Sequence, residues 1–346
     1  MENADIGVLH TKKLSLWFLI TVVLILALFA TVVLALCIGA VGISAGEILN
    51  ILFGGDASWS HKTIILNIRL PRVLLGGLVG TSLAIAGAAM QGLFRNPMAS
   101  PYVLGISSGA AFGASLSIVL GFSLVTGQFA NPVMAFIFAF ITLLLVYNIA
   151  KANGRVPVDT LLLAGIAIAA FFTALVSFMK YIAGEKLSTI VFWMMGGLWD
   201  SRWSFFGFAL PMVVAGVAMI LIYSRDLNVL MIGEEHAVNL GVNVPFVRNV
   251  ILVASSLVTA AAVSVSGVIA FVGLIVPHMM RLFVGPDNRI LLPVSCLVGA
   301  MFMILTDTLA RTIIAPEELP VGIITALLGA PFFLYLLKRR KGVTGW

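Results

Sequence analysis

Two adjacent segments decide the fold: the apolar run FFGFALPMVVAGVAMILIYS (205–224) and the polar segment RDLNVLMIGEEHAVNLGVNVPFVR (225–248). The apolar run has the roughly 20 residues that an α-helix needs to cross a bilayer. The polar segment holds three acids, two arginines, one histidine and two glycines, and a further apolar run follows it. A segment this polar must lie in water, so the chain leaves the membrane here and then re-enters it.

The same alternation runs through the whole chain. Of its 346 residues, 61% are hydrophobic and 10% are charged, and the mean hydropathy is +1.14. Soluble domains carry about 25% charged residues. About ten runs are long enough to span a bilayer. We therefore expect an all-α polytopic membrane protein with about ten transmembrane helices in a single domain, 1–346. The expected spans are 14–40, 70–94, 103–121, 132–150, 160–183, 205–224, 247–264, 268–284, 289–312 and 321–338.

The distribution of basic residues predicts the orientation. Lysine and arginine gather in cytoplasmic loops, and most of them fall on one side of the expected spans, led by the cluster KRRK (338–341). We therefore expect both termini in the cytoplasm. The net charge of +6 follows from this bias and does not imply a nucleic-acid partner. Cys37 and Cys296 both lie inside spans and suggest neither a disulfide nor a metal site.

Two segments outside the spans are expected to form short helices. Ser44 to Glu47 fits a capping box, and Gly54-Gly55 fits a helix stop, which predicts a surface helix between them. The segment 184–203 contains IVFWMMGGLW, which is too short for a span and rich in aromatic residues. It is expected to form an interfacial or re-entrant helix, either as a headgroup anchor or as part of the outer mouth.

The polar segment 225–248 is itself expected to fold. Glu234 and Glu235 favour the positive end of a short helix. Gly241 can close that helix in the left-handed conformation, and Pro245 suits the first turn of a second short helix. Such a tandem would expose Ala237, Val238 and Leu240 to a groove on a cytoplasmic partner. The alternative is an ordinary solvated loop.

Three arginines lie near the outer ends of the expected spans. Arg69 and Arg72 flank Leu70-Pro71, and such a pair could clamp a carboxylate or could simply anchor the helix by reaching into the headgroups. From the residues alone, anchoring is favoured. Arg311 follows Asp307 by four positions, which places both on one helix face. Structural pairing is the first interpretation of these two residues.

Several motifs are missing from the sequence. It contains no G-x-x-x-x-G-K-[ST] phosphate loop and no H-E-x-x-H zinc motif. We expect no cofactor and no bound metal. Asp307 is the main carboxylate within the spans, whereas ion-driven carriers use such groups as relays. An ion-gradient-driven secondary transporter is therefore the alternative, and a membrane enzyme ranks below it.

Four long segments resemble the FecCD-type permeases, the membrane subunits of ABC importers for ferric siderophores, haem and cobalamin. They occur in the order typical of that family, and the likeness runs from about residue 40 to the C-terminus. The segments are RLPRVLLGGLVGTSLAIAGAAMQGLFRNPMASPYVLGISSGAAFGA (69–114), GEEHAVNLGV (233–242), GVIAFVGLIVPHMMRL (267–282) and DTLARTIIAPEELPVGIITALLGAPFFLYLL (307–337).

The resemblance implies an assembly. It implies ten helices per subunit, a homodimer of about twenty, two copies of a separate cytoplasmic ABC ATPase, and an external substrate-binding protein. Arg69, Arg72 and Arg311 match the outer arginines that engage glutamates of the binding protein, which favours the clamp over anchoring. The segment 225–248 matches the coupling helices that contact the ATPase, with Gly233, Glu234, Glu235, Ala237, Leu240 and Gly241 at its centre.

The resemblance also implies a route and a cargo class. The pathway would follow the dimer axis along the fifth and tenth helices, with the loop Gly154 to Asp159 as part of an inner gate. We expect a permease in the cytoplasmic (inner) membrane of a prokaryote, surrounded by lipid. The cargo would be a metal chelate, with a ferric siderophore placed first and haem or cobalamin as alternatives.

Overall fold

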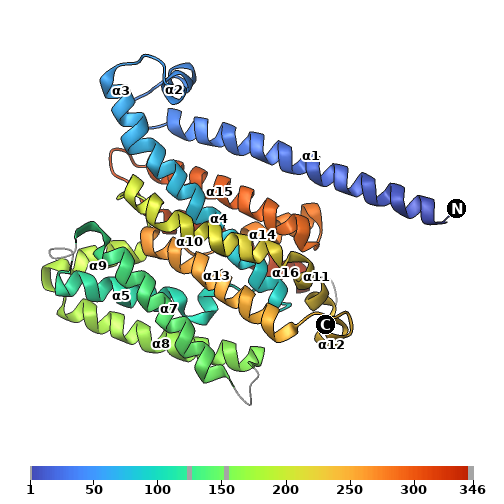
Figure 1. The fold of residues 1–346 in the computed structure, drawn as a ribbon. Helices are drawn as coiled ribbons and strands as arrows, with labels where there is room; N and C mark the ends of the chain where they lie inside the picture. Colours follow the sequence, from blue (N-terminus) through green and yellow to red (C-terminus); the bar gives the residue numbers. More distant parts are fainter. Residues whose placement is uncertain (1, 123–126, 152–155, 342–346) are drawn as a thin grey trace.

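The computed structural model describes residues 2–122, 127–151 and 156–341, and in this part of the chain it contains helices and turns but no strand (Figure 1). A π-helical turn, Ile64–Arg69, leads into α4, and 3-10 turns precede α5, α7 and α9. The α-helices are α1 (Glu2–Cys37), α2 (Ala45–Leu52), α3 (Trp59–Thr63), α4 (Leu70–Leu93), α5 (Ile106–Leu120), α7 (Ala130–Ala150), α8 (Val158–Ile182), α9 (Leu187–Met195), α10 (Trp203–Ile222), α11 (Ser224–Ile232), α12 (Glu234–Asn239), α13 (Val244–Ser266), α14 (Val272–Val284), α15 (Asn288–Ala310) and α16 (Val321–Lys341).

Each expected span contains a helix. Within the described residues, 7 helical segments are long and apolar enough to cross a membrane: Lys12–Cys37, Trp59–Leu93, Gly127–Ala150, Val158–Ile182, Trp203–Ile222, Val244–Ser266 and Asn288–Ala310. Three shorter apolar helices, Ile106–Leu120, Val272–Val284 and Val321–Tyr335, coincide with the remaining expected runs. The all-α polytopic fold is confirmed.

The shortest of these helices begins after a break. The sequence predicts a span from 268 to 284, but α14 starts only at Val272 because the chain turns after Ser266. Phe271 has a positive φ of 69°, which ends any continuous path from α13 into α14. The Tyr102 hydroxyl donates a hydrogen bond to the carbonyl of Ile269 in this break. A partly buried polar side chain thus satisfies one backbone carbonyl that the helices leave open.

Helix α4 forms the centre of the bundle and packs against α10, α13, α14 and α15. Its small residues allow the neighbouring backbones to come close. A Cβ atom at Gly87 would lie 1.8 Å from the carbonyl oxygen of Gly273 in α14. Such contacts let membrane helices pack without a hydrophobic driving force between them.

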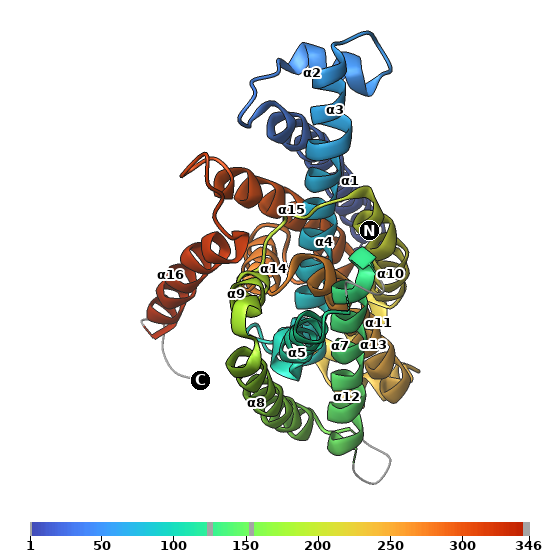
Figure 2. The ribbon, with the colours of Figure 1, turned by 90° about the vertical axis from the view of Figure 1, so that its left-hand side faces the viewer.

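Two long helices stand at the edges of the bundle. Helix α1 packs along α15 and projects away from the other helices at its N-terminal end (Figure 1). Helix α16 stands to one side, next to α14 and α9, when the molecule is viewed along the bundle (Figure 2). The start of α1 and the end of α16 lie at the end that carries α11 and α12, which we call the α12 end (Figure 1). The opposite end, with α2, α3 and α9, is the α2 end.

Both expected surface helices are present at the α2 end. Ser44 caps α2, with its hydroxyl accepting a hydrogen bond from the Glu47 amide at 3.3 Å. The Glu47 carboxylate lies 2.6 Å from His61 Nδ1 in α3, so it joins two surface helices instead of completing the capping box. The aromatic segment forms α9 and ends at Gly196, whose carbonyl accepts a hydrogen bond from Gly322 at the start of α16.

Candidate functional site

At the α2 end, Arg72 binds two carboxylates that differ in exposure. Its Nε and Nη2 atoms each donate to Asp307 at 2.9 Å, and its Nη1 atom donates to Glu318 at 2.8 Å. The Asp307 side chain is 3% exposed and the Glu318 side chain is 38% exposed, against 10% for Arg72. One edge of the guanidinium is therefore fixed inside the protein by Asp307, and another edge binds Glu318, a carboxylate that water can reach.

Arg69 and Arg311 bind the end of α1. Arg69 Nη1 donates to the carbonyl of Leu36 at 2.6 Å, and Arg311 Nη2 donates to the carbonyl of Ala35 at 2.6 Å. The last carbonyls of a helix have no partner within the helix and carry partial negative charge, so cations stabilise this position. These two arginines therefore hold α1 against the bundle, a contact that sequence spacing did not reveal.

The three arginines do lie together, but their environment differs from the expected open rim. Arg69 and Arg72 are both buried. Arg311 Nε lies 3.9 Å from Asp307, so the expected pairing is the weaker of two contacts to that carboxylate. The main partner of Asp307 is Arg72, which sequence spacing could not identify because Arg72 lies on another helix.

The bonding of Asp307 also argues against the carrier alternative. An ion-coupled carrier needs a carboxylate that takes up and releases a proton or an ion during transport. Asp307 instead accepts a bidentate hydrogen bond from Arg72, and Arg311 lies on its other side. It neutralises structural arginines at the α2 end of the bundle.

At the α12 end, the polar segment folds into two short helices, but not the two that the sequence predicts. Helices α11 and α12 meet at Gly233, which has a φ of +154°, and Gly241 follows α12 with a φ of +82°. The left-handed glycine that closes α12 is confirmed. Pro245 starts no separate short helix, because it forms the first turn of the long helix α13. The first short helix of the pair is instead α11, before Gly233.

The residues of α12 face in two directions. Ala237, expected on the surface, is fully buried, since it anchors the helix in the core cluster. Val238 is 61% exposed and Leu240 is 68% exposed. Glu234 and Glu235 are also exposed. The exposed face therefore combines two apolar side chains with two carboxylates.

Next to α12 lies an open cavity of about 480 Å³. Its lining comes from the end of α4, the start of α8, Glu234 and Arg248. Gly154 and Arg155 of the expected gate loop lie outside the described residues. Pro157 precedes α8 directly, and Val156 is buried.

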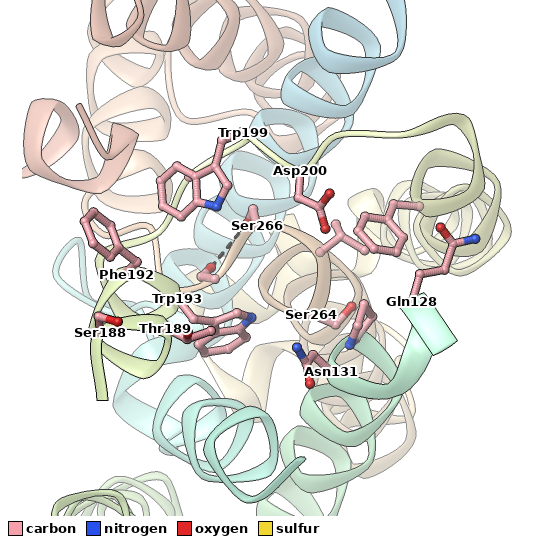
Figure 3. A pocket seen from close by; sticks show the side chains of 15 residues that line it. Gln128, Asn131, Ser188, Thr189, Phe192, Trp193, Trp199, Asp200, Ser264 and Ser266 are labelled. Carbon is pink, nitrogen blue, oxygen red and sulfur yellow. Dashed lines mark hydrogen bonds between the residues drawn. The ribbon is translucent and has the colours of Figure 1, made fainter. Parts of the chain in front are cut away.

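A second cavity, of about 400 Å³, opens at the α2 end between α7, α9, α10 and α13. Figure 3 shows Trp199 and Asp200 on one side of this cavity and Asn131 with Ser264 on the other. Asp200 accepts two hydrogen bonds from Arg202, and Arg202 also donates to Gln128 at 3.2 Å. The backbone carbonyl of Ser266 accepts a hydrogen bond from the amide of Gly197 at 2.8 Å. In the part of the chain that the structure describes, no three His, Cys, Asp or Glu residues are grouped as metal ligands.

The chain matches the model of the FecCD transport family over residues 17–339. It is 51% identical to a cobalamin import system permease of Halobacterium salinarum over 280 residues, which covers 81% of this chain and 74% of that protein. It is 42% identical to a hemin transport system permease of Yersinia pestis, over 95% of this chain and 96% of that protein. A solved structure, an inward-facing conformation of a metal-chelate type ABC transporter, matches with a TM-score of 0.82 and 37% identity, over 92% of this chain and 99% of that one.

These similarities cover nearly the whole chain and agree with its helical architecture. The chain belongs to the FecCD transport family and is a transmembrane permease of the ABC-transporter kind. The family assignment confirms the resemblance of the four long segments.

Proposed function

We propose that this chain is the membrane-spanning subunit of an ATP-driven importer for a metal chelate. The observation that carries the proposal is helix α12, which lies at one end of the bundle (Figure 1) and has exposed apolar side chains at Val238 and at Leu240, the residue that caps it. Exposed apolar side chains beside charges are typical of a docking surface. The proposed occupant is a cytoplasmic ABC ATPase, with one copy on each subunit of a homodimer.

The segment 225–248 would serve as the coupling segment. Gly233 and Gly241 set the direction of α12, Ala237 anchors it, and Glu234, Glu235 and Leu240 face the ATPase. This assignment places the α12 end in the cytoplasm, together with both termini. It also agrees with the basic cluster 338–341 under the positive-inside rule.

The α2 end would then face outwards and receive the binding protein. Arg72 is the arginine best suited to bind a carboxylate of that protein, because its contact with Glu318 is partly open to water. Docking would exchange Glu318 for a carboxylate of the binding protein, while Asp307 keeps its hydrogen bonds to the other edge of the Arg72 guanidinium. Arg69 and Arg311 would contribute positive charge and keep α1 in place.

A homodimer is supported by the apolar side chains left open on two helices. Leu163, Ile166 and Phe171 of α8 and Leu327 and Leu334 of α16 are all exposed. These are the fifth and tenth apolar helices, which the family resemblance places along the dimer axis. Lipid would cover the exposed face of α1 on the other side of the molecule.

Sequence identity to relatives with a named cargo ranks the candidate cargoes. The cobalamin permease is 51% identical to this chain, whereas the hemin permease is 42% identical. We therefore place a corrinoid first and haem second, ahead of the ferric siderophore that the sequence placed first. All three are metal chelates.

Purification from the native membrane tests the proposal. The tagged chain, extracted in a mild detergent, is expected to bring with it a protein that has the phosphate-loop motif this chain lacks. Identification by mass spectrometry would name it. A chain that consistently purifies without any ATPase, across several mild detergents, would contradict the importer assignment.

A further inference from the structure

Arg248 connects two segments that are far apart in the sequence. It lies in the second turn of α13, at the α12 end of the bundle. Its Nη2 atom donates to the Glu234 carboxylate, at the start of α12. Its Nη1 atom donates to the carbonyl of Val156 at 3.2 Å, two residues before α8 begins. A single guanidinium therefore holds both the proposed ATPase contact and the start of a proposed pathway helix.

The base of this side chain is firmly held. The neighbouring Asn249 accepts a hydrogen bond from the Tyr147 hydroxyl of α7 at 3.2 Å. Phe246 stacks edge-on against Tyr223 at the end of α10, with 5.9 Å between ring centroids. The following turns of α13 lie in the main core cluster. Arg248 thus projects from a fixed helix towards two segments at the edge of the bundle.

The two segments that it joins border open space. The cavity of about 480 Å³ is lined by Pro157, by Val158 and Asp159 at the start of α8, and by Glu234 and Arg248. Densely packed groups move together, but groups that border a cavity of this size have room to shift independently. The planar guanidinium, with donors in fixed directions, is a rigid connection across such a space.

We propose that Arg248 is a positioning residue that transmits displacement of α12 to the start of α8. In this account, the ATPase shifts α12, Glu234 carries the Arg248 side chain with it, and the bond to Val156 shifts α8. The inference rests on the proposed function of α12 as the ATPase contact. It adds a specific route from that contact to the helix that would line the pathway.

Replacement of Arg248 by lysine isolates this role. Lysine keeps the positive charge, but its single ammonium group lacks the planar fork that reaches a carboxylate and a carbonyl in two fixed directions. In the full importer, Arg248→Lys and Arg248→Gln are expected to keep the ATPase bound and hydrolysing ATP. Transport per ATP hydrolysed should fall by about fivefold to a hundredfold, the usual range of coupling between two sites. Lys151→Gln is the control, because it removes an exposed cation at the same end of the molecule.

A double variant that exchanges the charges tests the two contacts of Arg248, to Glu234 and to Val156, separately. In the double variant Glu234→Arg with Arg248→Glu, an ion pair can re-form, but a glutamate cannot donate to the Val156 carbonyl. We expect this variant to stay uncoupled. Restored coupling would overturn the role of the Val156 contact, and unchanged transport per ATP in Arg248→Lys would overturn the proposal. If the proposed function itself were wrong, the unmodified chain would bind no ATPase and show no ATP-dependent transport.

Discussion

At the scale of single residues, Arg72 shows how one side chain can serve structure and docking together. Its bond to Asp307 is buried, and its bond to Glu318 is partly open to water. Removing one member of a buried ion pair leaves an uncompensated charge, whereas exposed pairs contribute little to stability. The two carboxylates should therefore respond differently to the loss of their charge.

We expect Asp307→Asn to lower the free energy of unfolding by about 3–5 kcal/mol. Glu318→Gln should change it by less than about 1 kcal/mol, and it should strengthen binding-protein docking, because Arg72 loses its internal competitor. Thermal unfolding in detergent and titration with the binding protein measure the two effects. Glu317→Gln is the matched control, since Glu317 is an exposed neighbour in the same loop. Equal docking by the Glu317 and Glu318 variants would contradict the exchange.

The arginines also show what the sequence could predict at this scale. The family resemblance placed Arg69, Arg72 and Arg311 at one end of the protein, and the structure brings them together. The resemblance could not show that Arg69 and Arg311 donate to the last carbonyls of α1, because such contacts depend on how the helices pack. The sequence identified Arg248 only as one of two arginines in the polar segment. Its contacts could not be predicted, because its two partners lie 14 and 92 positions away.

At the scale of elements, local signals predicted helix ends well. The Ser44 cap and the Gly241 stop are both present. The pattern around Pro245 was misread, because a proline in a first turn fits a long helix as well as a short one. The shortened helix α14 could not be predicted, since an apolar run has the same composition whether or not its first residues are helical.

Gly241 offers a test of α12 as an element. Its φ of +82° disfavours any side chain, while the space around the position where a Cβ would stand is open. We expect Gly241→Ala to cost about 1–2 kcal/mol in local backbone energy, to loosen α12, and to reduce co-purification of the ATPase. Gly207→Ala in α10 is the control, because that site is also open but has an ordinary helical backbone. Full ATPase recovery with the Gly241 variant would argue against α12 as the contact.

Acid should weaken the junction at the start of α15. The side-chain hydrogen bond from Arg289 holds the pKa of Asp287 well below its usual range, and Asn228 of α11 adds a second bond. A carboxylate whose pKa is lowered in the folded state stabilises the fold above its unfolded pKa of about 3.9 and loses this contribution as the pH falls below it. We expect the melting temperature to decrease as the pH drops below about 4. Asp287→Asn should show a smaller decrease over that range, and an identical pH profile would contradict the assignment.

At the scale of the whole molecule, the composition and the apolar runs were enough to predict a polytopic helical bundle. The proposed dimer depends on which exposed surfaces meet lipid and which meet a second subunit. Helices α8 and α16 lie towards one side of the molecule and α1 lies towards another (Figure 2). All three helices have exposed apolar side chains. Length and hydropathy cannot distinguish a face that meets lipid from one that meets a second subunit.

Cross-linking distinguishes these faces. A short bismaleimide should join two copies of Leu327→Cys on α16 but not two copies of Phe18→Cys on α1, although both side chains are well exposed. Both variants are made in a chain with Cys37 and Cys296 replaced by serine, and the dimer is detected by denaturing electrophoresis. A dimer band from Phe18→Cys alone would place the subunit contact on α1 and contradict the proposed pathway between α8 and α16.

We propose that ATP hydrolysis on a partner drives uptake through this chain. The most direct measurement is uptake of radiolabelled cobalamin by proteoliposomes that contain the chain with its co-purified ATPase and binding protein. We expect uptake that requires hydrolysable ATP and persists when ionophores dissipate every ion gradient. Parallel assays with haem and a ferric siderophore identify the cargo under the same conditions. Uptake of any of these chelates that proceeds without ATP and stops when the gradients are dissipated would contradict ATP-driven import through this chain.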